Sequence, residues 1–168
     1  MPDALKIYPE AYKANFSFGQ GELLVSCLDV LNVYSVCAYG YRRDFSLVKG
    51  IYEGTEEEVL FEKGASERIL SENTVMKMRE MMRFCVTDGT GREARVTGTE
   101  AGGKTATAQS GQYKKGSEML HTWFAGVFPI DNPRYAVVVL CDGNGKSNAS
   151  PKEIFALCAE SVLEICDN

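Results

Sequence analysis

The chain has 168 residues, of which 45% are apolar and 24% are charged, a composition typical of about one globular domain. Its formal net charge of −5 argues against a broad nucleic-acid-binding surface, which requires a basic face. No apolar run approaches the roughly 20 residues that span a bilayer, and the first residues lack a signal-peptide pattern, so we expect the chain as given to be soluble.

The six cysteines are dispersed singly along the chain, and no C-x-x-C pair occurs among them. Because the chain has one histidine, this spacing predicts no zinc site, and no other metal or cofactor is implied. We expect most of the cysteines to act as small apolar residues rather than as partners in disulfides.

Residues 1–21 predict an irregular entry segment, and residues 22–168 predict helices and a sheet. A first helix is expected to begin after Ser26, because a serine followed three residues later by Asp29 forms a capping box. Gly40 is expected to close this helix, since glycine readily adopts the left-handed conformation found at helix C-termini.

Two short strands are predicted next, over residues 45–52 and 58–62, because both segments carry scattered Glu and Lys and are joined by Gly54. A second helix is predicted to start near Ser71 and to end at the glycine-containing turn that begins with Asp88. Its apolar stripe is expected to face the core and consists of Val75, Met78, Met82, Cys85 and Val86.

Three strands are predicted near residues 104–110, 120–129 and 134–141. A final helix is predicted after Ser150, which precedes a proline at the first helical position and a glutamate at the third. The side chains expected to face the core on this helix are Ile154, Leu157, Cys158, Val162 and Ile165. Together these elements predict an α+β fold, with an antiparallel sheet and helices packed on it.

Residues 98–105 match the phosphate-binding loop pattern G-x-x-x-x-G-K-[ST], and residues 137–142 resemble the apolar strand that ends in a magnesium-binding Asp. Such a loop requires a buried strand before it and a helix N-terminus after it. After Thr105, small and polar residues alternate up to Gly111, which predicts a strand followed by a loop. A P-loop nucleotide-binding protein is therefore the less favoured alternative.

Four blocks of sequence occur in an order that is typical of one family. Residues 17–34 contain Ser-x-Gly-Gln-Gly and the start of a helix, residues 89–91 are Gly-Thr-Gly, residues 103–109 are Gly-Lys-Thr-Ala-Thr-Ala-Gln, and residues 121–139 contain His-x-Trp-Phe-x-Gly and Tyr-Ala-Val-Val-Val. These blocks resemble motifs of penicillin-binding protein transpeptidase domains, with Cys27 in place of the usual proline. The resemblance implies the C-terminal portion of that serine β-lactamase-like fold.

By this resemblance, residues 1–168 are the C-terminal part of a peptidoglycan D,D-transpeptidase domain, which is a serine acyltransferase. Lys104 and Thr105 are implied to bind the terminal carboxylate of a D-Ala-D-Ala stem peptide, and Lys104 to help carry protons to the departing D-Ala. The Thr107 amide is implied to donate to the oxyanion. Ala106 stands where the family usually has Gly, and its methyl group either narrows the strand edge or is tolerated. β-Lactams, which trap the same acylation step, are the other implied ligands.

The family's nucleophilic serine, in a Ser-x-x-Lys that opens a helix, and its Ser-x-Asn loop both precede the block that starts at Ser17. We therefore expect neither in this chain, and predict that the fragment alone is inactive. Similar-looking patterns occur at residues 46–49 and 71–73. We interpret Ser46 as a strand residue whose side chain points to the face opposite Lys49, and Ser71 as a helix N-cap.

His121 is expected to have a structural, hydrogen-bonded role rather than that of a general base, and Trp123 and Phe124 are expected to be core residues. Truncation is expected to expose apolar surface and so to favour self-association. By resemblance, the parent protein is anchored in the cytoplasmic membrane with this domain on the extracytoplasmic side. The alternative function is a non-catalytic binding or assembly module that keeps the fold.

Overall fold

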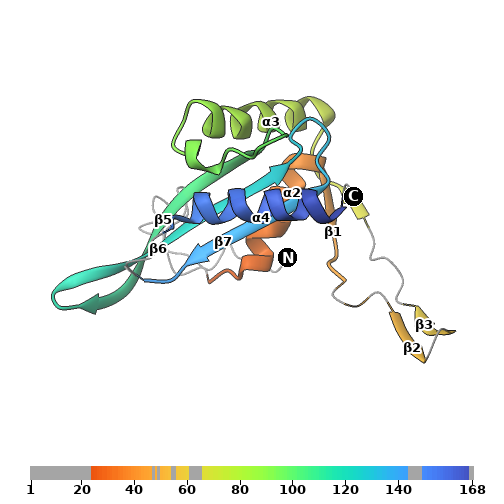
Figure 1. Ribbon diagram of the computed structural model, residues 1–168, viewed down its shortest axis with the longest axis horizontal. Helices are drawn as coiled ribbons and strands as arrows, with labels where there is room; N and C mark the ends of the chain where they lie inside the picture. Colours follow the sequence, from red (N-terminus) through yellow and green to blue (C-terminus); the bar gives the residue numbers. More distant parts are fainter. Residues whose placement is uncertain are drawn as a thin grey trace, which may run out of the picture.

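The computed structural model describes residues 24–46, 48, 50–53, 56–60, 66–143 and 149–166. Figure 1 shows a mixed fold of helices and antiparallel strands, which confirms the predicted α+β class. The elements follow one another as α2 (Cys27–Tyr39), β1 (Tyr41–Arg43), β2 (Gly50–Glu53), β3 (Glu56–Leu60), β4 (Ser66–Arg68), α3 (Glu72–Thr87), the 3-10 helix η3 (Arg92–Ala94), β5 (Gly102–Lys114), β6 (Ser117–Phe128), β7 (Tyr135–Cys141) and α4 (Pro151–Cys166). The irregular segment predicted for residues 1–21 lies outside the described residues.

The central sheet has the order β5-β6-β7, and both pairings are antiparallel. Strands β5 and β6 are longer than predicted and are joined by a two-residue turn at Lys115 and Gly116, which have φ values of 52° and 81°. This turn type matches the twist of a hairpin and needs positive φ at both positions. Gly111 does not end β5 as expected; it lies in a register shift between Gln109 and Tyr113 and has a φ of 68°.

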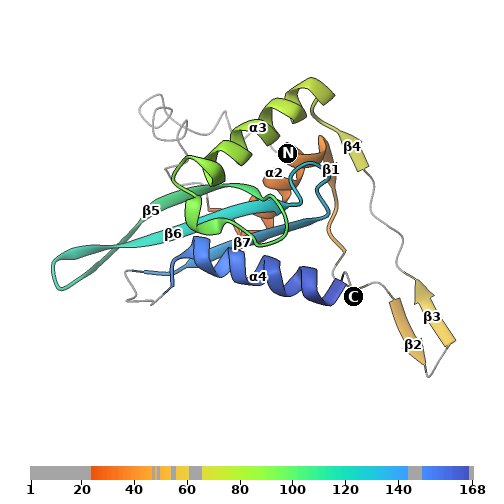
Figure 2. The same cartoon turned by 45° about the horizontal axis from the view of Figure 1, so that its top comes forward.

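Helices cover both faces of this sheet (Figures 1 and 2). Helix α4 packs on one face, where the rings of Phe124 and Phe155 lie 4.7 Å apart between centroids. Helix α2 packs against β6 and β7 on the other face, and α3 lies along β5. Side chains that alternate along the strands therefore enter two separate apolar layers.

The larger core cluster lies on the α4 side and includes Phe124, Phe128 and Phe155, all fully buried. The second cluster lies on the α2 and α3 side and includes Ala38, Met82, Val127 and Ile130. Trp123, which was expected to be core, is only half-buried, because its side chain lies on the face opposite that of Phe124.

The three long helices begin as the sequence predicts. Ser26 accepts from the Asp29 amide while Asp29 accepts from the Ser26 amide, so the capping box is complete. Ser71 caps α3 by accepting from the Thr74 amide. Ser150 and Glu153 make the equivalent reciprocal pair at the start of α4.

Of the residues predicted to face the core on α4, Val162 packs against it, whereas Leu157, Cys158 and Ile165 are exposed. The buried residues of α4 are Pro151, Phe155 and Ala159, with Val162 and Leu163 partly buried against the core. Leu157 is 61% exposed and Ile165 is 78% exposed. The sequence places apolar residues on both sides of this helix, and the bulkier Phe155 fills the space beside Phe124 and Phe128.

The strand pair predicted over residues 45–52 and 58–62 exists as the β2–β3 hairpin, in which β2 is shorter than predicted and β3 lies two residues earlier. Figures 1 and 2 show it well away from the central sheet. A second pair, β1 with β4, was not predicted. Its strands are three residues long and are held by contacts distant in sequence, including an Arg68 guanidinium 4.6 Å from the centre of the Tyr41 ring.

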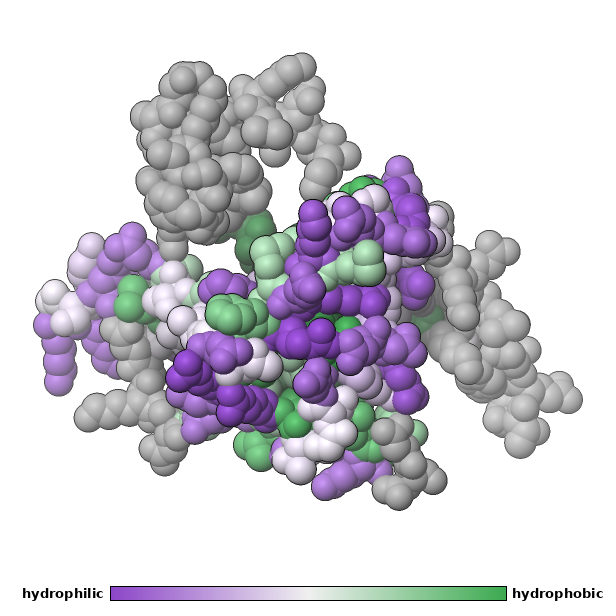
Figure 3. Space-filling model, turned by 90° about the horizontal axis from the view of Figure 1, so that it is seen from above, coloured by the Kyte–Doolittle hydropathy of each residue, from purple (hydrophilic) through white to green (hydrophobic). Residues whose placement is uncertain are grey.

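Figure 3 views the molecule from the α3 side, where hydrophilic residues predominate and apolar ones are scattered among them. Helix α3 carries exposed apolar residues, among them Met76, Met81 and Phe84, which are 59%, 59% and 64% exposed. Met81 and Phe84 are three positions apart and so are neighbours on the helix surface.

Candidate active site

The Gly-Lys-Thr segment lies inside strand β5, close to its N-terminal end. Gly103 is required there, because a Cβ atom would lie 2.6 Å from the Ala125 carbonyl oxygen and 2.6 Å from the Phe124 ring. Gly102 is required for a similar reason, since its Cβ would lie 2.5 Å from Ile130. The two glycines let β5 lie directly on the core and fix the position of the residues that follow.

This strand setting argues against the nucleotide-binding alternative. A phosphate-binding loop presents the N-terminus of a helix to its ligand immediately after the Lys-Ser/Thr pair. Here Lys104 and Thr105 are followed by nine more residues of the same strand. The residues after Lys104 and Thr105 therefore form strand where the phosphate-binding pattern requires the first turn of a helix.

Lys104 and Thr105 stand next to each other with side chains on opposite faces of β5. The exposed Lys104 side chain bends back, so that Nζ donates to the Thr105 carbonyl oxygen at 2.8 Å and to Thr105 Oγ1 at 3.3 Å. Within the described part of the chain, Lys104 forms no ion pair with a carboxylate. The Lys104 ammonium and the Thr105 hydroxyl therefore lie together, and no carboxylate of the described residues pairs with the ammonium.

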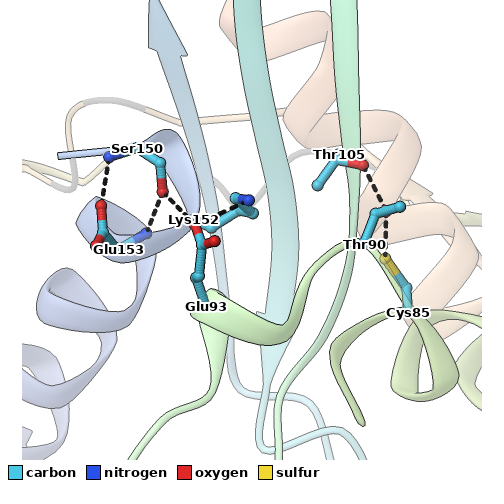
Figure 4. Close-up of polar contacts among 7 residues, drawn as sticks. All are labelled: Cys85, Thr90, Glu93, Thr105, Ser150, Lys152 and Glu153. Carbon is cyan, nitrogen blue, oxygen red and sulfur yellow. Dashed lines mark hydrogen bonds and ion pairs between the residues drawn. The ribbon is translucent and has the colours of Figure 1, made fainter. Parts of the chain in front are cut away.

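Thr90 lies in the turn after α3, next to Thr105 of β5 (Figure 4). Thr90 Oγ1 is 2.8 Å from Thr105 Oγ1 and 3.8 Å from the sulfur of Cys85. The sequence alone identifies Thr90 only as the middle residue of a Gly-Thr-Gly block. Thr90 and Thr105 are 15 positions apart in the sequence, and their contact depends on how the turn packs against β5.

A cavity of about 670 Å³ borders these residues. One side is formed by β5, including Thr105, Ala106 and Thr107, and the other by the beginning of α4, including Ser150 and Lys152. Thr90 also lines it. All three residues predicted to bind the substrate beside Lys104 therefore border one cavity.

The α4 side of the cavity is held by a polar cluster centred on Glu93 (Figure 4). Ser150 Oγ donates to Glu93 Oε2 at 2.9 Å, and Lys152 Nζ lies 2.8 Å from the same oxygen. The hydrogen bonds from Lys152 and Ser150 hold the pKa of Glu93 below its ordinary value. Lys152 is thus paired with a carboxylate, which distinguishes it from Lys104.

The outer edge of β5 is not paired with another strand in the part of the chain that the structure describes. Ala106 is exposed and lies opposite Trp123 in the register of β5 and β6. An unpaired edge of this kind can accept an extended peptide as an additional strand. The Ala106 methyl group stands at this edge and leaves the strand geometry regular.

His121 lies on β6 opposite Ala108, four residues along β5 from Lys104. Its Nδ1 is 2.8 Å from Asp142 Oδ1, at the end of β7. The hydrogen-bonded role expected for His121 agrees with this contact, which links β6 to the residue that follows β7.

The two serine look-alikes do not form a paired site among the described residues. Ser46 lies in an irregular segment before β2, not in the strand predicted for it, and its exposed hydroxyl donates to the Val48 carbonyl at 2.5 Å. This local turn replaces the strand pairing expected there. Lys49 and the Ser17 block lie outside the described residues. Ser71 is occupied as the N-cap of α3, as predicted.

All six cysteines are free thiols: Cys85 is buried, Cys37 and Cys141 are half-buried, and Cys27, Cys158 and Cys166 are exposed. In the residues that the structure describes, no group of three His, Cys, Asp or Glu side chains is arranged to hold a metal ion. Across the same residues, none of the helices combines the length and apolar character needed to cross a membrane.

Comparison with known proteins gives a consistent result. The family described as "Penicillin binding protein transpeptidase domain" matches residues 6–159. The penicillin-binding protein PbpB of Mycolicibacterium smegmatis is 30% identical over 90% of this chain and 26% of that protein. Stage V sporulation protein D of Bacillus subtilis is 37% identical over 46% of this chain and 12% of that protein.

Solved structures show the same relationship. The crystal structure of penicillin binding protein 3 from Mycobacterium tuberculosis, complexed with aztreonam, superposes with a TM-score of 0.83 and 25% identity, covering 97% of this chain and 40% of the other. The transpeptidase domain of penicillin-binding protein 3 from Burkholderia pseudomallei, at 23% identity, shares the fold with a TM-score of 0.77 and is covered to 49%. The chain thus spans about a quarter of its mycobacterial relative and less than half of these structures.

Proposed function

Because this chain belongs to the penicillin-binding protein transpeptidase-domain family, we propose that it supplies the Lys-Thr strand wall of a peptidoglycan D,D-transpeptidase site. The single observation that carries this proposal is the contact between the exposed Lys104 and the half-buried Thr105 on the unpaired edge of β5, where Thr105 borders a cavity. The ligand is the D-Ala-D-Ala end of a stem peptide, or a β-lactam in its place. A neighbouring structure is a complex with the β-lactam aztreonam, which supports the choice of ligand.

Each residue has a chemical role in this proposal. The peptide lies along the edge of β5 and adds backbone hydrogen bonds to it. The Lys104 ammonium and the Thr105 hydroxyl bind the terminal carboxylate, a charge-assisted contact that is stronger than a neutral one. The Thr107 amide donates to the oxygen of the carbonyl under attack, a type of contact worth about 3 kcal/mol in the transition state.

The covalent step requires a serine. Its oxygen attacks the carbonyl of the penultimate D-Ala, an ester forms as the peptide bond breaks, and the departing D-Ala amine takes up a proton that Lys104 helps to deliver. Ser46-Leu47-Val48-Lys49 is the one Ser-x-x-Lys in the sequence. Since Ser46 does not open a helix, we propose that the acylated serine belongs to residues upstream of this sequence and that the chain alone is inactive.

Two further parts of the proposal concern the whole protein. The longer protein is anchored in the cytoplasmic membrane and places this domain on the extracytoplasmic side, where peptidoglycan is assembled. The exposed Leu157 and Ile165 on α4 form an apolar surface through which the chain alone associates with itself.

The alternative is a module of the same fold that binds stem peptides or partners without catalysing a reaction. The observation that favours it is that the carboxylate-binding pair is present while Ser46 is placed as a turn residue. Binding of a D-Ala-D-Ala peptide by the chain alone, without hydrolysis or transfer in its longer form, would support this alternative.

Mass spectrometry tests the proposed function. The chain alone and a longer form that carries the natural upstream sequence are incubated with excess benzylpenicillin, and their intact masses are recorded. We expect no change for the chain alone and one penicillin adduct for the longer form. An adduct on the chain alone would place a reactive serine within these residues, with Ser46 the first to be examined. No adduct on either form would remove the transpeptidase assignment.

A further inference from the structure

We propose that Thr90 is a positioning residue, which orients the hydroxyl of Thr105 so that its proton points toward the carboxylate of the bound ligand. This inference rests on the proposed function and assigns a role to the Gly-Thr-Gly turn after α3. The observation behind it is the distance of 2.8 Å between Thr90 Oγ1 and Thr105 Oγ1, at the wall of the cavity (Figure 4).

The turn holds Thr90 in a fixed position. The Gly89 amide donates to the Phe84 carbonyl and the Gly91 amide donates to the Cys85 carbonyl, both at 2.9 Å. A Cβ on Gly89 would clash with the Cys85 backbone at 2.9 Å, and one on Gly91 would make a tight contact with the Cys85 sulfur at 3.1 Å. Thr90 is therefore held between two residues packed against the last turn of α3.

The donors and acceptors around Thr105 set the direction of the hydrogen bonds. The Lys104 ammonium has only protons to donate, and at 3.3 Å it occupies one acceptor position of Thr105 Oγ1. A bound carboxylate is acceptor-only, so it is contacted by Thr105 only through the hydroxyl proton. If Thr105 donated to Thr90 instead, that proton would be unavailable to the ligand.

Thr90 prevents this by donating to Thr105 itself. Its own oxygen then has an acceptor position that faces the Cys85 sulfur at 3.8 Å, within range of a weak S–H donor. The resulting order runs from Cys85 to Thr90 to Thr105 to the ligand carboxylate, with one proton donated at each step. Each hydroxyl accepts one hydrogen bond from the preceding residue, and no proton is transferred.

The surroundings of Thr90 argue against a purely structural role. Its side chain is exposed rather than packed in the core. It does not cap η3, whose first turn begins at Gly91 without a side-chain cap. Among the described residues, the recorded hydrogen-bond partners of the Thr90 hydroxyl are Thr105 and Cys85.

The test compares the second-order rate constant of acylation by benzylpenicillin with that by its methyl ester, in the longer form of the protein. Thr90→Val keeps the β-branched shape and removes the hydroxyl. We expect it to slow acylation by the free acid about three- to tenfold, the worth of one hydrogen bond, and to slow acylation by the ester less, because the neutral ester carbonyl is a weaker acceptor than the carboxylate. Thr90→Ser is expected to restore the rate, and Thr97→Val, which changes an exposed threonine in another turn, to have no effect.

A double-mutant cycle completes the test. In a Thr105→Val background, Thr90→Val is expected to have no further effect, because the hydroxyl that it orients is absent. Equal slowing with the acid and the ester, or an undiminished effect in the Thr105→Val background, would show a structural role and overturn the inference. An unchanged rate for Thr90→Val would overturn it as well. If the unmutated longer form is not acylated, the proposed function itself fails, and this inference fails with it.

Discussion

At the residue scale, Lys104 and Lys152 differ in whether a carboxylate pairs with them. Lys152 is paired with Glu93, whereas Lys104 contacts only its neighbour Thr105 in the described structure. Lys152 and Glu93 fix α4 to η3. The proposed ligand role falls to Lys104, whose ammonium has no carboxylate partner among the described residues.

The Glu93 cluster makes a prediction about pH. Because the pKa of Glu93 is lowered in the folded state, its contribution to stability is present above the ordinary value of 4.5 and is lost as pH falls through the folded pKa. Glu93→Gln cannot ionise, so we expect its melting temperature to fall less than that of the unmutated chain between pH 5 and pH 3. Melting followed by circular dichroism measures this. Equal falls in the two proteins would contradict the assigned cluster, and Glu80→Gln, which changes an exposed carboxylate of α3, is the matched control.

At the element scale, the sequence predicted helix ends better than it predicted which face of a helix is buried. Ser26, Ser71 and Ser150 cap their helices as expected, because capping is a local interaction within four residues. The buried face of α4 was missed because apolar residues occur all around the helix. Only the position of Phe124 and Phe128 on the sheet decides that Phe155 points inward.

The stability of two variants on α4 tests this correction. Phe155→Ala removes a fully buried ring and is expected to lower the free energy of unfolding by about 3–5 kcal/mol. Leu157→Ala changes a residue that is 61% exposed, so its effect should stay within about 0.5 kcal/mol. Urea unfolding measures both values, and the reverse order would restore the originally predicted face.

The same Leu157→Ala variant addresses self-association. If α4 carries the associating surface, sedimentation velocity should show the unmutated chain shifting to larger species with concentration, and the variant shifting less. A chain that stays monomeric at every concentration would remove this part of the proposal.

Long-range contacts at the site could not be read from the sequence. The Gly-Lys-Thr strand was identified because its residue types alternate, and Gly102 and Gly103 are explained by the close approach of β5 to the core. The contact between Thr90 and Thr105 arises only when the turn after α3 packs beside β5. The strand predicted over residues 45–52 starts only at Gly50, because the Ser46 hydroxyl bonds to the Val48 carbonyl and residues 44–46 are irregular.

At the scale of the whole molecule, the three-stranded sheet and its helices place one edge strand, one cavity and one unpaired cation together. Membership of the penicillin-binding protein transpeptidase-domain family supports a catalytic interpretation of this arrangement. The central claim is that Lys104 binds and helps to turn over the carboxylate-bearing ligand on β5.

The rate of acylation by benzylpenicillin in the longer form, with Lys104→Ala compared against Lys114→Ala, tests that claim most directly. Lys114 is an exposed lysine at the far end of the same strand, so its replacement controls for loss of charge on β5. We expect Lys104→Ala to lower the rate about a hundredfold, because it removes both a carboxylate contact and a proton carrier, and Lys114→Ala to leave it unchanged. Equal rates in the two variants would contradict the assignment of Lys104 and, with it, the proposed site.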